Sequence, residues 1–221
     1  MEDSRRAAAR RIAHEHLARG DALGWFEDLY AQAHGDTSVV PWADSKPNPH
    51  LHSWLETHDV RGEGKLALVV GCGLGDDAEE LARRGFVTTA FDISPTAIAW
   101  CRKRFPASTV EYDAVDLFAA PEGWNSRFDF VSECYTLQVL PANLRPKAMA
   151  SIAGFVRREG ALLLIARGRE PSEPEGSMPW PLTRAELSTF VTRGLRETSF
   201  EDFPDADDPA VRRFRTAYVR A

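Results

Sequence analysis

Short runs of apolar, β-prone residues alternate with helix-like segments from residue 66 onward, and this alternation constrains the fold more than any other feature. The apolar runs lie at 66–70, 87–92, 109–112, 128–132 and 160–166, and the helical segments lie near 76–84, 95–104 and 143–156. Such alternation is typical of βαβ units, in which right-handed crossovers place helices on both faces of a parallel sheet. The sequence therefore predicts an α/β fold of the Rossmann-like, doubly wound type.

The N-terminal region has a different pattern. Helices are expected over 4–19, from Asp21 onward, and over 50–58, with the proline-containing loop TSVVPWADSKPNPH before the last. We therefore divide the chain into an N-terminal helical, lid-like extension, 1–60, and an α/β domain, 61–221. A Gly/Pro/Glu-rich loop spans 168–181, and we expect it to close over a substrate together with the N-terminal region.

Composition and charge indicate the general class of protein. The net charge of −6 argues against a dedicated nucleic-acid binder, because such proteins usually have a basic face. The three cysteines lie far apart in the sequence, as in a reduced, cytoplasmic protein. The longest apolar run, ALLLIA, is too short to span a bilayer, and the N-terminus lacks the apolar core of a secretory signal. We expect a cytoplasmic protein with neither a membrane nor a nucleic-acid partner; the oligomeric state is unknown.

The segment VVGCGLGDD, residues 69–77, follows the first predicted strand and opens the next helix. Gly71, Gly73 and Gly75 permit a tight turn and the close approach of a ligand. A dinucleotide fingerprint would place a glycine where Asp76 stands, and the acidic pair Asp76 and Asp77 at the helix N-terminus would repel a diphosphate. An uncharged or cationic ligand fits better, and S-adenosylmethionine, which has a sulfonium and no phosphate, is such a ligand.

Acidic residues lie at the ends of the next two strands. Asp92 is placed to accept hydrogen bonds from two ribose hydroxyls, and its neighbour Ile93 could lie against an adenine ring. Asp116 could accept a hydrogen bond from the adenine amine, with Leu117 as an apolar wall. Asp113 could take the role of Asp116 if the third strand ends at another residue.

With these motifs, the sequence resembles the class I S-adenosylmethionine-dependent methyltransferases. The resemblance lies in VVGCGLGDD, AFDIS, VDLF and FDFVSECYTLQVLP, and its core covers residues 66–166. It implies a seven-stranded, mostly parallel sheet whose last strand is antiparallel, with the final strands at 195–203 and 211–219.

The loop VVPWADSKPNP resembles a cofactor-covering loop of the thiopurine, halide and thiol methyltransferase branch, through Pro41, Trp42 and Asp44. The resemblance implies that Trp42 lies over the cofactor; loop packing is the alternative. Phe26 and Tyr30 have helical spacing and are expected in the core.

Glu133 and Tyr135 are the candidate catalytic residues, because they follow the fourth strand near the expected methyl group, and Glu133 is also a candidate cofactor ligand. The predicted α/β core contains no histidine that could act as a general base, which favours a soft nucleophile. Loop histidines such as His34, His50 or His52 could nevertheless fold over the site.

No metal site is predicted, because the histidine pairs are spaced i,i+2 and do not share a helical face. Arg167 and Arg169 are expected to be solvated, although an anionic substrate group could use them.

The sequence therefore predicts a methyltransferase that moves a methyl group from S-adenosylmethionine to a small molecule by in-line displacement. A thiol, a halide or a similar soft nucleophile is the favoured acceptor. An O- or N-methyltransferase of a small metabolite or natural product is the first alternative. An NAD-linked oxidoreductase and a non-catalytic cofactor-binding protein are the alternatives from other classes.

Overall fold

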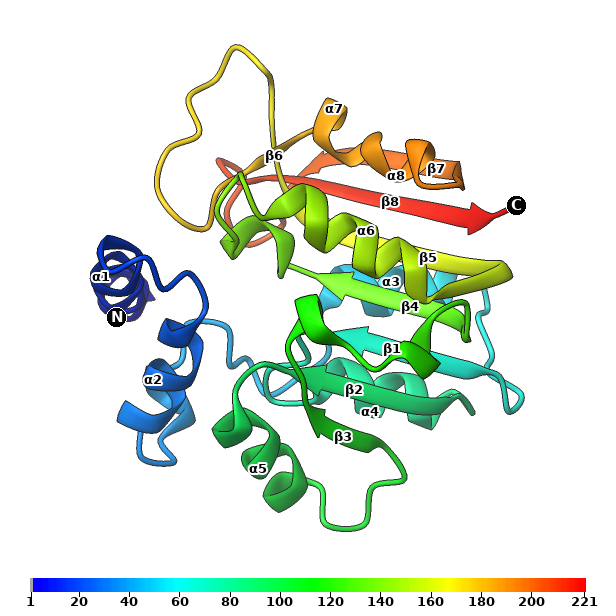
Figure 1. Ribbon diagram of the computed structural model, residues 1–221, viewed down its shortest axis with the longest axis horizontal. Coiled ribbons are helices and arrows are strands. Elements are labelled where there is room, and N and C mark those ends of the chain that lie inside the picture. Colours follow the sequence, from blue (N-terminus) through cyan, green and yellow to red (C-terminus); the bar gives the residue numbers. More distant parts are fainter. Residues whose placement is uncertain (1) are drawn as a thin grey trace.

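The computed structural model describes residues 2–221, with side chains from Ser4 onward, and its centre is one mixed β-sheet (Figure 1). The strands are β1 (Leu66–Val70), β2 (Val87–Asp92), β3 (Glu111–Ala114), β4 (Phe128–Cys134), β5 (Val156–Arg169), β6 (Leu182–Thr183), β7 (Leu195–Pro204) and β8 (Arg212–Arg220). Seven of them follow the order β3-β2-β1-β4-β5-β8-β7, and the two-residue β6 pairs with the end of β5. The first five of that order are parallel, and β8 is antiparallel to both β5 and β7. The expected fold class is therefore confirmed.

Helices cover both faces of the sheet. They are α1 (Glu2–Ala18), α2 (Gly24–Gln32), α3 (Pro49–Thr57), α4 (Asp76–Arg83), α5 (Pro95–Arg104), α6 (Arg145–Phe155), α7 (Arg184–Leu187) and α8 (Thr189–Thr192). Single 3₁₀ turns are η1 (Thr37–Val39), η2 (Leu117–Ala119), η3 (Glu122–Trp124) and η4 (Leu137–Val139). One core cluster joins the sheet to α3, α4 and α5, and the other joins it to α6, α7 and α8.

Successive residues of β1 show why the central strands are apolar throughout. Leu68 and Val70 belong to the cluster with α6, whereas Ala67 and Val69 belong to the cluster with α3, α4 and α5. Side chains alternate between the two faces of a strand, and both faces of this sheet are covered. Apolar residues are therefore required at every position.

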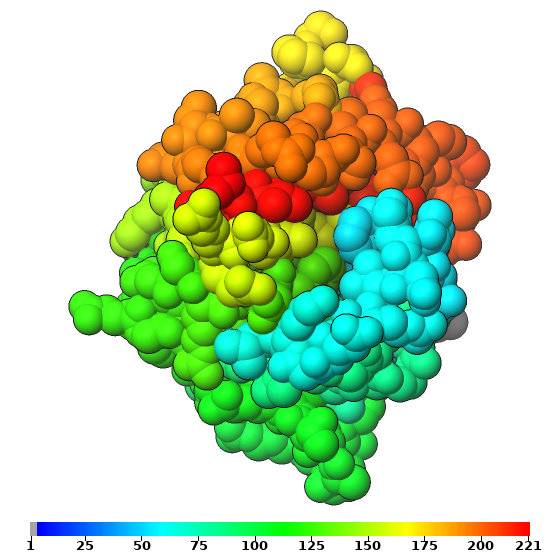
Figure 2. Space-filling view, turned by 90° about the vertical axis from the view of Figure 1, so that its right-hand side faces the viewer, coloured from blue at the N-terminus to red at the C-terminus, as the bar shows by residue number. Residues whose placement is uncertain are grey.

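The N-terminal helices lie beyond the carboxyl ends of the parallel strands (Figure 1). Ile12 of α1 and Trp25 of α2 pack in one cluster with Met178, so these helices contact the 168–181 loop. Figure 2, which shows the right-hand side of the molecule in Figure 1, has no blue atoms, so α1 and α2 do not reach that face.

Some boundaries differ from those expected. The strand expected at 109–112 is β3, Glu111–Ala114, and β5 extends beyond 160–166 because its first residues pair with β4 across an irregular register. Helix α3 packs on the sheet through Leu51 and Leu55, both fully buried. The domain boundary at residue 60 stays a prediction.

Candidate active site

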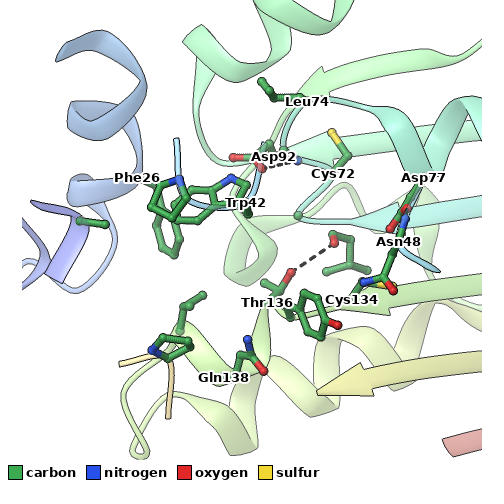
Figure 3. Close-up of a pocket in the computed structure, with 18 of the residues that line it drawn as sticks. Phe26, Trp42, Asn48, Cys72, Leu74, Asp77, Asp92, Cys134, Thr136 and Gln138 are labelled. Carbon is green, nitrogen blue, oxygen red and sulfur yellow. Dashed lines mark hydrogen bonds between the residues drawn. The ribbon is translucent and has the colours of Figure 1, made fainter. Parts of the chain in front are cut away.

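A cavity of about 590 Å³ opens at the carboxyl ends of the parallel strands (Figure 3). Its lining includes Val70 of β1, Asp92 of β2, Cys134 of β4 and Arg167 of β5. The strand order reverses between β1 and β4, and ligands of open α/β sheets bind at such a point. The cavity therefore lies where the fold places a ligand.

The glycine turn forms one wall of this cavity. Gly71 and Gly73 line it with φ of +61° and +54°, a conformation that other residues rarely adopt. A Cβ at Gly71 would collide with the Thr136 hydroxyl. Gly75 lies outside the cavity lining that the structure describes, and a Cβ there would lie 2.6 Å from the Tyr112 hydroxyl. The structure thus places the first two glycines at the site and the third in the packing beneath it.

Asp92 is a buried carboxylate held against the glycine turn. Its Oδ2 accepts a hydrogen bond from the Gly73 N–H (2.9 Å), and its Oδ1 accepts one from the Ser94 N–H (3.0 Å). Burial raises the pKa of Asp92 to about 6, so the group is ionised at neutral pH. A carboxylate oxygen has more than one lone pair, so each oxygen can also accept from a ligand hydroxyl.

The other predicted adenosine contacts also line the cavity. Ile93 follows Asp92 directly, and Asp116 and Leu117 follow the neighbouring strand, β3. The Asp116 Oδ1 accepts the Phe118 N–H (2.8 Å), which fixes the start of η2 and leaves the second carboxylate oxygen for a ligand. The strand order therefore brings these residues together; their roles stay predictions.

Trp42, in the loop between α2 and α3, lies against the glycine turn (Figure 3). Its Nε1 donates to the Tyr30 hydroxyl (2.6 Å), and a Cβ at Gly73 would lie 3.6 Å from the indole. Phe26 and Tyr30 also line the cavity, although their spacing predicted core positions. Tyr30 is nevertheless a core residue, as expected, because it is 1% exposed and belongs to a core cluster.

The acidic pair at the start of α4 is engaged by other parts of the chain. Asp76 forms a bidentate ion pair with Arg104 (2.8 and 2.9 Å). The Asp77 Oδ1 accepts the Asn48 N–H (2.7 Å), and burial raises the pKa of Asp77 to about 6. Because Arg104 offsets the charge of Asp76, charge repulsion is a smaller obstacle to a diphosphate than the sequence suggested. The main obstacle is that the Asp76 and Asp77 side chains and their partners already occupy the N-terminus of α4.

Tyr135, one of the two candidate catalytic residues, lines the cavity. Its φ of +71° is rare for a bulky residue and is a kind of strain that clusters at functional sites. The Arg213 guanidinium lies 4.8 Å from its ring centroid, and burial raises the pKa of the phenol to about 12. The phenol is therefore neutral at physiological pH.

Glu133, the other candidate, is fully buried and lies outside the cavity lining that the structure describes. Its Oε1 accepts the N–H groups of Thr136 (2.6 Å) and Leu137 (3.0 Å), whereas its Oε2 has no partner among the described residues. Glu133 therefore holds the turn that carries Tyr135.

Replacing Glu133 with glutamine should flatten the pH dependence of stability. Burial raises the pKa of Glu133 from 4.5 to about 7, so the folded state binds a proton that the unfolded state releases between these values. The resulting stabilisation is complete below about pH 4.5 and is lost as pH rises through 7, on the order of 3 kcal/mol in total. Denaturant unfolding from about pH 5 to pH 8 should therefore show a smaller decline for E133Q than for the wild type. The exposed-site variant E122Q should decline like the wild type, and an equal decline in E133Q would contradict the assignment.

The sequence did not single out the pair His50 and Asp205. The His50 Nε2 lies 3.3 Å from the Asp205 Oδ2, and both residues line the cavity. Burial, with the charges of Arg213 and Arg215, lowers the pKa of His50. His50 belongs to the loop histidines that the sequence left open, whereas nothing in the sequence marked Asp205. The structure also places Asn48 and Gln138 at the cavity.

His52, Glu56 and Glu80 come close enough to hold a metal ion in principle. Glu80 accepts from Arg84 (2.7 Å) and Arg83, and Arg84 also pairs with Glu56. This group is an ion-pair network, and we assign no metal to it. None of the helices in the described part of the chain has the length and apolarity that a bilayer crossing requires.

Comparisons with known proteins agree with the geometry. Residues 67–160 match the family described as "Methyltransferase domain". A "Ubiquinone biosynthesis O-methyltransferase" of Azotobacter vinelandii is 38% identical over 146 residues, which cover 55% of this chain and 62% of the relative. The "Probable thiol methyltransferase 2" of Arabidopsis thaliana is 23% identical over 202 residues, which cover 88% of this chain and 83% of that protein.

A solved structure shares the fold over nearly the whole chain. It is the 1,6-didemethyltoxoflavin-N1-methyltransferase of Burkholderia thailandensis, with bound 1,6-didemethyltoxoflavin and S-adenosylhomocysteine. The TM-score is 0.69 at 18% identity, and the match covers 94% of this chain and 90% of the other.

The strand order, with the cavity at its switch point, is the fold of the class I methyltransferases. Residues 67–160 match a methyltransferase domain, and the family resemblance seen in the sequence is confirmed. The chain spans only about half to 62% of the length of the ubiquinone-type relatives.

Proposed function

We propose that the protein is an S-adenosylmethionine-dependent methyltransferase that methylates an oxygen atom of a small molecule. The observation that carries this proposal is the cavity at the β1/β4 switch point, with the Asp92 carboxylate fixed against a glycine turn. The O-methyltransferase names of the ubiquinone-type relatives support the choice of oxygen.

The residues present fit the cofactor. S-adenosylmethionine supplies a methyl group that its sulfonium activates. Asp92 and Asp116 have free acceptor capacity for hydroxyl and amine groups, and Leu117 is an apolar wall. Gly71 and Gly73 let a ligand approach the backbone, and Trp42, held by Tyr30, excludes water from that side. Positioning of this kind contributes much of the rate in a displacement reaction.

An oxygen acceptor needs a group that takes its proton, and His50 is suited to this task. Its lowered pKa keeps the imidazole neutral near pH 7, and its contact with Asp205 can fix the tautomer. With Nε2–H donating to Asp205, Nδ1 is left to accept a proton. Tyr135 and Gln138 line the same region and can orient the acceptor.

A thiol methyltransferase is the second candidate, because the Arabidopsis protein with that name matches most of this chain. A thiol needs less help from a base, because its thiolate forms close to neutral pH. His50 would then have no task in proton removal.

A transfer screen with methyl-tritiated S-adenosylmethionine tests the proposal. The acceptors are matched phenols, enols, thiols, amines and halide ions, each assayed with the wild-type protein. We expect label in phenols or enols. Label in thiols or halide alone would favour the second candidate, and the absence of label with every acceptor would contradict the proposed activity.

A further inference from the structure

Arg167, near the carboxyl end of β5, lines the cavity with a guanidinium that has no fixed partner. Its backbone N–H donates to the Gln138 Oε1 (2.7 Å), but no hydrogen bond or ion pair joins its guanidinium to any residue that the structure describes. Other lining arginines are engaged: Arg10 donates to the Met178 carbonyl (2.7 Å) and Arg213 to Asp205 (2.7 Å). The guanidinium of Arg167 is therefore available to a ligand.

Positive charge gathers around Arg167 from separate elements. Arg6 and Arg10 come from α1, and Arg213 comes from β8. Burial, followed by repulsion from Arg213, Arg6 and Arg10, lowers the pKa of Arg167. A half-buried cation among like charges destabilises the protein unless an anion shares the site.

The nearby acidic groups do not supply that anion. Asp205 accepts hydrogen bonds from Arg213 and from the Asp207 N–H (3.0 Å), and it contacts His50. Asp207 and Asp208 line the cavity as well, but neither forms an ion pair with Arg167. The guanidinium of Arg167 is therefore left without a hydrogen-bond or ion-pair partner among the residues that the structure describes.

Arg167 also lies on the acceptor side of the cavity. The strand order is β2-β1-β4-β5, so Asp92 at the end of β2 and Arg167 near the end of β5 lie on opposite sides of the switch point. Apolar side chains of Val139, Leu140 and Met178 line the cavity too. This combination suits an apolar or aromatic body with an acidic group.

We propose that Arg167 binds a carboxylate of the methyl acceptor, which makes the substrate an apolar or aromatic hydroxyl compound that carries an acidic group. This inference rests on the proposed function, because only a methyltransferase has a methyl acceptor. Binding of a carboxylate by Arg167 can nevertheless be measured without methyl transfer. The carboxylate of the cofactor is a rival source of the same chemistry, and the experiment must separate the two.

Benzoate and benzamide, which have almost the same shape and differ in charge, are the probes. We expect the wild-type protein, with and without S-adenosylhomocysteine, to bind benzoate at least about tenfold more tightly than benzamide by NMR titration. R167Q should lose this preference, because glutamine has no charge, whereas R167K should retain part of it. R158Q, at the exposed and opposite end of β5, is the matched control and should bind like the wild type.

S-adenosylhomocysteine affinity decides between the two carboxylates. It should stay within about twofold of the wild-type value in R167Q, and a loss of about tenfold would assign Arg167 to the cofactor and overturn the proposal. Equal binding of benzoate and benzamide by the wild type, or an undiminished preference in R167Q, would also overturn it. If the wild type prefers benzoate through Arg167 but does not bind S-adenosylhomocysteine, the anion site stands and the methyltransferase proposal fails. Thermal melting of each variant confirms that it is folded.

Discussion

Replacing Asp92 with asparagine should weaken the binding of S-adenosylhomocysteine by about a hundredfold or more at pH about 7.5. Asp92 is ionised at that pH, and its two oxygens, already fixed by Gly73 and Ser94, are the expected acceptors for the ribose hydroxyls. Asparagine has one acceptor oxygen, and its amide group would donate where the cavity needs an acceptor. Isothermal titration calorimetry measures the change.

The choice of asparagine separates binding from folding. An alanine variant would leave the N–H groups of Gly73 and Ser94 without their acceptors, so the glycine turn itself could change. Asparagine keeps the side-chain volume and one of these hydrogen bonds. D113N is the control, because Asp113 lies on β3 outside the cavity lining that the structure describes, and this variant should bind the ligand like the wild type. Unchanged affinity in D92N would refute the ribose assignment.

Replacing His50 with glutamine should lower kcat for an oxygen acceptor by about 10²–10⁴-fold and change KM less. Below its lowered pKa His50 is protonated and cannot act as a base, so the wild-type kcat should rise with pH, with a midpoint below the ordinary histidine pKa of about 6.5. Asp205, Arg213 and Arg215 face His50, and the arginines and burial favour its neutral form. H50Q should lose this rise. Steady-state kinetics across pH, with an acceptor from the label screen, measure both effects.

His52 provides a matched control on the same helix, α3. Its Nδ1 contacts Glu80 (3.0 Å), and it lies outside the cavity lining that the structure describes. H52Q should therefore keep the wild-type kcat and pH profile. A kcat in H50Q within about twofold of the wild type would remove His50 from the mechanism and favour a thiol acceptor.

The sequence predicted the parts of the site that depend on local rules. Gly71 and Asp116 follow strands, and Asp92 ends one, whose apolar runs are visible in the sequence, and parallel strands bring their carboxyl ends to one edge of the sheet. Knowing where each strand ends was therefore enough to predict that these residues lie together.

The remaining parts depend on how distant segments pack. His50 and Asp205 are separated by 155 residues, and their meeting requires both α3 and the segment before β8 to reach the same cavity rim. The surroundings of Arg167, whose guanidinium has no partner among the described residues, likewise depend on how α1, β5 and β8 meet, which no local pattern reveals. For Glu133 the difficulty was to predict which way its side chain points. Successive residues of a strand point to opposite faces, and on β4 it is Cys134, not Glu133, that lines the cavity.

The central claim is that the cavity beside the glycine turn holds an adenosyl sulfonium compound rather than a dinucleotide. Calorimetric titration of the wild-type protein with S-adenosylhomocysteine, and separately with NADH, tests it most directly. We expect saturable one-to-one binding of S-adenosylhomocysteine and no measurable binding of NADH. Binding of NADH without binding of S-adenosylhomocysteine would contradict the account.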